Sequence, residues 1–139
     1  MKNLFLSLVL LFMSSLTHAQ DITGKWLTED GEAVVETYLS GDKLYGKIVW
    51  LKNANDAGGK PLTDQENPDK SKRSRTLIDL LMLIDFKLDN KKWEGGKIYD
   101  PSDGKTYRCS IWLEKDKLKV RGYVGMFYQT QTWTRKIDE

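Results

Sequence analysis

The sequence has very few of the residues on which most small enzymes and disulfide-stabilised proteins depend. It contains one cysteine, Cys109, and one histidine, His18, which lies near the N-terminus. A single cysteine excludes an intrachain disulfide, so the core must supply the stability. Without His18 the remaining chain has no imidazole, which excludes Ser-His-Asp and Cys-His catalytic systems and zinc sites built from histidine or several cysteines.

The chain also lacks an excess of charge of one sign and a long hydrophobic run. Its 22 Lys and Arg nearly balance its 20 Asp and Glu. Nucleic-acid-binding proteins usually show a clear basic excess, so we expect no nucleic-acid partner. The apolar run at 4–12 is shorter than the ~20 residues that a transmembrane helix needs. We therefore expect no membrane span in the mature protein, and we expect no cofactor.

The first residues have the three parts of a secretory signal peptide. Lys2 supplies a positive charge, an apolar stretch follows at 4–12, and small residues lead up to Ala19. We expect cleavage after Ala19, so that 1–19 is a signal peptide and 20–139 is one domain in the periplasm or secreted. The alternative is an uncleaved anchor, which the shortness of the run disfavours.

Alternation of apolar and polar residues dominates the mature chain. It predicts about eight strands, bounded by turn residues such as Asp30-Gly31 and Gly41-Asp42. Short links favour pairing between neighbouring strands, and closure removes the edges that an open eight-stranded meander would expose. We therefore predict an all-β fold, a single antiparallel up-and-down barrel, whose interior is wide enough for side chains or one small ligand.

Two segments depart from this alternation. Residues 53–76 are rich in glycine, proline and charge, and are predicted to form a long excursion over one end of the barrel. In this loop we expect Asp64, Asn67 and Asp69 to build turns, with a calcium site as an alternative whose spacing matches no known calcium loop. Residues 77–88 fit a buried helix or a strand, and a strand is favoured in the second half.

Both ends of the mature chain resemble the calycin pattern of lipocalins, fatty-acid-binding proteins and avidins. The matching residues are Gly24-Lys25-Trp26 near the start and Thr132-Trp133-Thr134-Arg135 at the end. In that pattern an early tryptophan closes the barrel floor beneath a late arginine, which stacks on the indole. The resemblance implies a structural floor made of Gly24, Trp26, Trp133 and Arg135.

A second resemblance covers nearly the whole mature chain. The sequences GKIVW at 46–50, WEGGKIYDP at 93–101 and RGYVG at 121–125 resemble a bacterial exported family known as domain of unknown function 2147, DUF2147. The chain departs from the family pattern at 76–79, where the family has a proline before the leucine and a glycine near Asp79. The resemblance implies export and a calycin-like barrel, and it implies no activity.

Aromatic residues motivate a functional hypothesis, because five Trp, six Tyr and four Phe are more than a floor and a core require. We predict that the barrel binds a small hydrophobic or amphipathic ligand, with residues 53–76 partly covering its mouth. The alternative is an envelope interaction or stress module with a self-filled core. We expect no enzyme, because the turn carboxylates show no apolar burial that would raise a pKa.

The candidate ligand-binding residues are aromatic, basic or amide side chains on the predicted strands and on the excursion. Gln129 and Gln131 share a strand face with Trp133, so that an inward face would bring two amides into the barrel. The full set is Trp50, Arg75, Trp93, Tyr99, Arg121, Tyr123, Gln129 and Gln131.

Overall fold

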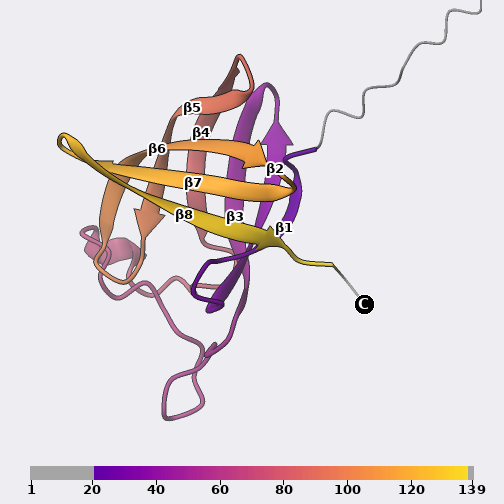
Figure 1. The fold of residues 1–139 in the computed structure, drawn as a ribbon. Coiled ribbons are helices and arrows are strands. Elements are labelled where there is room, and N and C mark those ends of the chain that lie inside the picture. The colour runs from indigo at the N-terminus through magenta and orange to yellow at the C-terminus, as the bar shows by residue number, and fades with distance from the viewer. Residues whose placement is uncertain (1–20, 138–139) are drawn as a thin grey trace, which may run out of the picture.

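Eight antiparallel strands form a closed barrel in the computed structural model, which describes residues 21–137 (Figure 1). Each strand pairs with its neighbours in sequence, and β8 pairs back with β1, as predicted for an all-β up-and-down barrel. The predicted signal peptide lies outside the described residues. The strands are β1 Gly24–Leu27, β2 Ala33–Ser40, β3 Lys43–Leu51, β4 Leu81–Asp89, β5 Lys92–Asp100, β6 Lys105–Glu114, β7 Lys117–Val124 and β8 Phe127–Arg135.

The ambiguous segment at 77–88 resolves into a loop followed by a strand. Residues 77–80 precede β4, which confirms the strand favoured for the second half. Asp79 has a φ of 71°, a left-handed conformation that glycine adopts without a steric penalty. Asp79 therefore holds a backbone conformation that usually favours glycine.

Large side chains fill one end of the barrel and form its floor. Trp26 and Trp133 are fully buried there, together with Phe86. The Arg135 guanidinium lies 4.2 Å from the centroid of the Trp26 ring, and its nitrogens donate to the carbonyl oxygens of residues 21 and 23 at 2.7 and 3.1 Å. A Cβ on Gly24 would lie 2.9 Å from Nη1 of Arg135, so this glycine leaves room for the cation. These contacts form the floor that the calycin resemblance implied.

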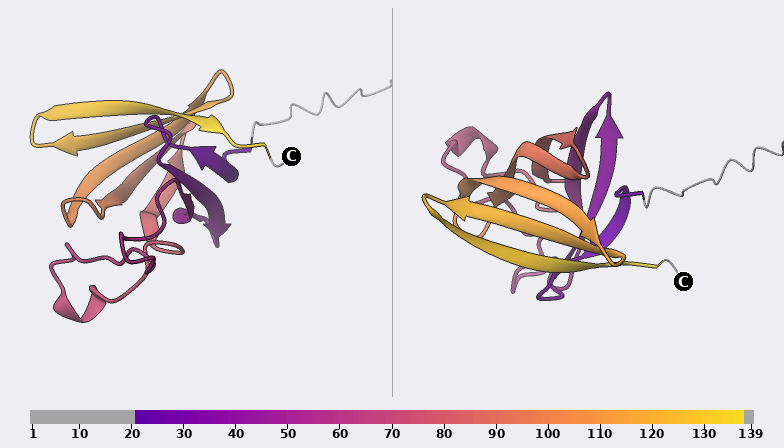
Figure 2. Two further views of the ribbon diagram at one scale, coloured as in Figure 1. Left: turned by 90° about the horizontal axis from the view of Figure 1, so that it is seen from below. Right: turned by 45° about the horizontal axis from the view of Figure 1, so that its top comes forward.

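The junction between β1 and β8 is the shortest in the barrel. Within residues 21–137 these strands pair only at Trp26 with Arg135 and at Leu27 with Thr134, and Lys136 N donates to Lys25 O at 2.8 Å. By contrast, β7 and β8 pair along the whole of β7. The β7–β8 hairpin extends away from the first strands (Figure 2).

The excursion at 53–76 leaves the barrel after β3 and lies below it in Figure 1. It contains one short 3-10 helix, η1 Lys70–Lys72, and two isolated bridges, 55 to 61 and 63 to 76. Just after it, Leu77 and Ile78 pack against a small apolar cluster of Ile48, Leu80 and Tyr99. In the part of the chain that is described, no helix is long and apolar enough to cross a bilayer.

Candidate ligand-binding site

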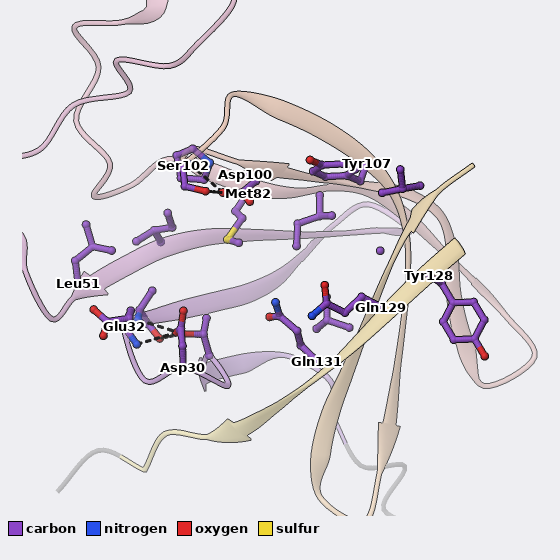
Figure 3. A pocket seen from close by; sticks show the side chains of 18 of the residues that line it. Asp30, Glu32, Leu51, Met82, Asp100, Ser102, Tyr107, Tyr128, Gln129 and Gln131 are labelled. Carbon is purple, nitrogen blue, oxygen red and sulfur yellow. Dashed lines mark hydrogen bonds between the residues drawn. The ribbon is translucent and has the colours of Figure 1, made fainter. Parts of the chain in front are cut away.

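A cavity of about 720 Å³ opens at the end of the barrel opposite the floor (Figure 3). Its wall combines the last residues of β3, β5 and β7 with the first residues of β2, β4, β6 and β8 and the turn between β1 and β2. The apolar part of this wall consists of Ala33, Ile48, Leu51, Met82, Ile98, Pro101, Val120, Val124 and Phe127. Small-molecule sites in proteins have volumes of roughly 300 to 1,000 Å³, so one small ligand fits here.

The hollow follows from the size of the inward side chains. At the floor these are two tryptophans and a phenylalanine, whereas the cavity is lined by smaller residues such as Ala33, Val120 and Gly122. A Cβ built on Gly122 would meet no atom within 4 Å. The barrel is therefore packed in one half and hollow in the other.

Carboxylates stand at the mouth of the cavity. In the β1–β2 turn, Oδ1 of Asp30 accepts the Glu32 amide at 3.0 Å and the Thr28 hydroxyl at 2.7 Å. These hydrogen bonds, the Glu32 amide first, lower the pKa of Asp30. At the end of β5, Oδ1 of Asp100 accepts the Ser102 amide at 2.9 Å and its hydroxyl at 2.6 Å. Both aspartates are therefore held in fixed orientations.

Gln129 and Gln131 line the cavity on β8, in the inward orientation that the alternation favoured (Figure 3). Gln131 Oε1 accepts the Trp133 indole N–H at 2.9 Å. This hydrogen bond connects the polar wall of the cavity to the floor and fixes the orientation of the Gln131 amide. Its amide nitrogen is a donor suited to a polar group of a ligand.

Trp50 does not line the cavity, contrary to the prediction. Consecutive residues of β2 pair with Ile48 and Trp50, so Val49 is an extra residue in β3. Such a bulge reverses which later side chains face inward. Leu51 therefore lines the cavity, and Trp50 is 46% exposed on the outside.

A bulge in β5 separates Trp93 from Tyr99 in the same way. The register shifts between Trp93 and Gly96, and Gly95 has a φ of 73°. Trp93 packs against the core of the closed half, while Tyr99 is buried in the small cluster beside the excursion. Neither Trp93 nor Tyr99 lines the cavity, contrary to the prediction that both bind the ligand, and they lie on different faces of the sheet.

Arg121 and Tyr123 also lie away from the cavity, on the outer face of β7. The Arg121 guanidinium lies 4.1 Å from the Tyr128 ring centroid and 4.9 Å from that of Trp112, and its Nε donates to Thr130 at 2.8 Å. The Tyr123 ring lies 6.2 Å from the Tyr128 ring. Neither Arg121 nor Tyr123 lines the cavity, contrary to the prediction that both bind the ligand.

The excursion is fastened to the outside of β5 by a buried carboxylate. Asp64 is fully buried, its Oδ1 accepts the Tyr99 hydroxyl at 2.7 Å, and its Oδ2 accepts the Asn67 amide at 2.8 Å. Asn67 Oδ1 in turn accepts the Asp69 amide at 2.9 Å, and Asp69 caps η1. The backbone N–H of Asp64 also donates to the carbonyl oxygen of Arg75 at 2.8 Å.

These contacts correct two predictions about the excursion. None of the described residues 53–76 lines the cavity, so the segment does not cover the mouth, and the exposed Arg75 side chain does not face a ligand there. Across residues 21–137, no three His, Cys, Asp or Glu side chains come together in a way that could hold a metal ion. The loop carboxylates act as structural acceptors.

Replacing Tyr99 by phenylalanine is expected to lower the free energy of unfolding by about 1–3 kcal/mol at neutral pH, because buried Asp64 loses a donor. Burial, and next the bond to Asp64, raises the pKa of Tyr99 to about 12, above the ordinary value of about 10. The stabilisation is therefore fully present below pH 10 and is lost as the pH rises towards 12. Urea titrations across this range should show the two proteins converging, and a constant difference would contradict this role.

Comparison with known proteins agrees with the barrel. The model of a family described as uncharacterised proteins conserved in bacteria, DUF2147, matches residues 24–135. Among solved structures, protein HP1028 of the human pathogen Helicobacter pylori, described as belonging to the lipocalin family, aligns with a TM-score of 0.73 at 24% identity. The alignment covers 85% of this chain and 84% of that one. No curated protein sequence gives a significant match.

Proposed function

Since this chain belongs to the DUF2147 family of uncharacterised bacterial proteins, we propose its function from the cavity: it binds one small amphipathic ligand in a lipocalin-like barrel. The observation that carries the proposal is a hollow of about 720 Å³ with an apolar inner wall and a polar mouth. Apolar walls with a few well-placed polar groups are typical of small-molecule sites. The proposal includes no catalytic step.

We further propose that binding takes place outside the cytoplasm. The support is the sequence alone, which gives residues 1–19 the charged, apolar and small-residue parts of a signal peptide. The barrel closes through strand pairing without a disulfide, and its single cysteine, Cys109, is buried. The fold is therefore compatible with an oxidising compartment.

Native mass spectrometry of the mature protein, purified gently from the cell envelope, is the direct test. We expect a reproducible added mass that is lost on denaturation, and 1:1 binding of the neutral fluorescent probe N-phenyl-1-naphthylamine to the emptied protein. Gly122→Leu should weaken probe binding about tenfold or more, because its side chain enters the open space at Gly122. A protein that carries no added mass and binds no probe would overturn the proposal.

A different observation favours the interaction module as a second candidate. The tip of the β7–β8 hairpin exposes apolar side chains beside the cavity mouth, with Met126 91% and Phe127 76% exposed. Exposed apolar clusters of this kind mark contact surfaces in many proteins. The second candidate predicts that a Met126→Ser variant, at a position that does not line the cavity, keeps probe binding and loses association with an envelope partner.

A further inference from the structure

All the charged side chains that line the cavity are acidic. Its lining includes three acidic residues, Asp30, Glu32 and Asp100, and no lysine or arginine. Over the whole sequence basic residues slightly outnumber acidic ones, 22 to 20. The charge at the mouth therefore differs from that of the chain as a whole, and it lies beside the hollow that we propose as the binding site.

Hydrogen bonds fix the orientation of two of these carboxylates. Within residues 21–137, the hydrogen bonds that the structure shows to the carboxylates of Asp30 and Asp100 all fall on Oδ1. Each aspartate is thereby oriented while its Oδ2 stays available as an acceptor. Asp30 comes from the β1–β2 turn and Asp100 from the end of β5, and Figure 3 shows them on two sides of the hollow.

Two lysines stand near the mouth but do not line the cavity. Lys52 lies 3.9 Å from the Glu32 carboxylate, with both side chains at least half exposed, so part of the Glu32 charge is offset. Lys105 is opposite Asp100 in the β5–β6 pairing and is exposed. Because neither lysine lines the cavity, the carboxylates of the wall are the charged groups that a ligand inside it would meet.

We propose that the ligand carries a positively charged head, an amine or a quaternary ammonium group, on an apolar body. The head lies at the mouth between Asp30 and Asp100, and the body lies against Ile48, Ile98 and Val120. The half-buried Tyr107 ring on the same wall adds a face that attracts cations. An anionic head, such as that of a fatty acid, meets like charge at the same place. This inference rests on the proposed function, since it names the ligand class of the same cavity.

Matched alkyl chains with different heads test the inference. Isothermal titration calorimetry at pH 7 and low salt would compare decyltrimethylammonium, decanol and decanoate, each below the concentration at which it forms micelles. We expect the ammonium compound to bind about tenfold or more tightly than decanol, as for a contact with a charged group, and decanoate to bind most weakly. The preference should shrink as salt is added.

Isosteric variants assign the effect to the two aspartates. Asp30→Asn combined with Asp100→Asn should weaken decyltrimethylammonium binding about tenfold or more and leave decanol binding unchanged. Asp42→Asn, in the β2–β3 turn at the closed end, removes the same charge far from the mouth and should change neither. Far-UV circular dichroism and thermal melting would verify that each variant is folded.

The outcomes separate the two proposals. If decanol and decanoate bind as tightly as the ammonium compound, or if the double variant keeps the ammonium preference, the cationic head is wrong and the ligand-binding function stands. If none of the three compounds binds and the purified protein carries no ligand mass, both the function and the head group fail. Tight ammonium binding that depends on the two aspartates supports both.

Discussion

Replacing Trp26 by alanine is expected to lower the free energy of unfolding by about 3–5 kcal/mol, the largest effect of any substitution considered. Trp26 is fully buried at the floor, so its removal leaves a large void. Its indole N–H donates to Ile22 O at 3.1 Å and lies 3.2 Å from Thr37 Oγ1, and both acceptors would lose a partner. The Arg135 guanidinium would also lose the ring on which it lies.

Urea denaturation followed by circular dichroism measures this loss, and a second tryptophan supplies the control. Trp50 is 46% exposed on the outside of β3, so Trp50→Ala should cost well below the Trp26 value, at about 1 kcal/mol or less. Equal losses at the two positions would contradict the assignment of Trp26 to the floor. A Trp26→Ala protein that stays folded should keep its cavity mouth, because the two features lie at opposite ends of the barrel.

Replacing Gly96 by alanine is expected to destabilise the protein by about 1–3 kcal/mol through overpacking. A Cβ on Gly96 would lie 2.3 Å from Cγ of Phe86, closer than atoms in contact can approach. Phe86 is fully buried on the neighbouring strand β4, so its ring has no free space into which it can move. The glycine is therefore required by the ring that lies over it.

Gly122→Ala is the matched control, because it adds the same methyl group to a strand glycine whose Cβ position is empty. Thermal melting should show a small change for Gly122→Ala and a clear decrease for Gly96→Ala. Phe86→Leu should reduce the cost of Gly96→Ala, giving a favourable coupling energy in a double-mutant cycle. Independent, additive effects would show that Gly96 matters for a reason other than the Phe86 ring.

Strand positions and the barrel floor could be read from the sequence because local signals specify them. The alternation and the turn pairs such as Gly41-Asp42 mark where strands begin and end, and the structure has the turn between β2 and β3 at these two residues. Whether a strand side chain points into the barrel or outward was predictable only where no bulge intervenes. The extra residue Val49 in β3 reverses which later side chains point inward, and Trp50 was therefore misplaced. The irregularity at Gly95 in β5 has the same effect on Tyr99.

The candidate site was predictable in part. Gln129 and Gln131 were found because β8 alternates regularly from them to Trp133. Arg121 and Tyr123 alternate with apolar Val120, which already indicated an outward face. The acidic mouth was missed because Asp30 and Asp100 occur in turn motifs, where aspartate has an ordinary structural role. Only the three-dimensional closure of the barrel brings these two turns to the same cavity.

The short junction between β1 and β8 has a consequence for how the molecule moves. Backbone hydrogen bonds resist separation of neighbouring strands, and here two residue pairs supply that resistance where the β7–β8 pairing has eight. Regions held by few contacts exchange with open forms at the lowest free-energy cost. We therefore expect the barrel wall to open most readily along the β1–β8 junction, which would offer a ligand a second, lateral way into the interior.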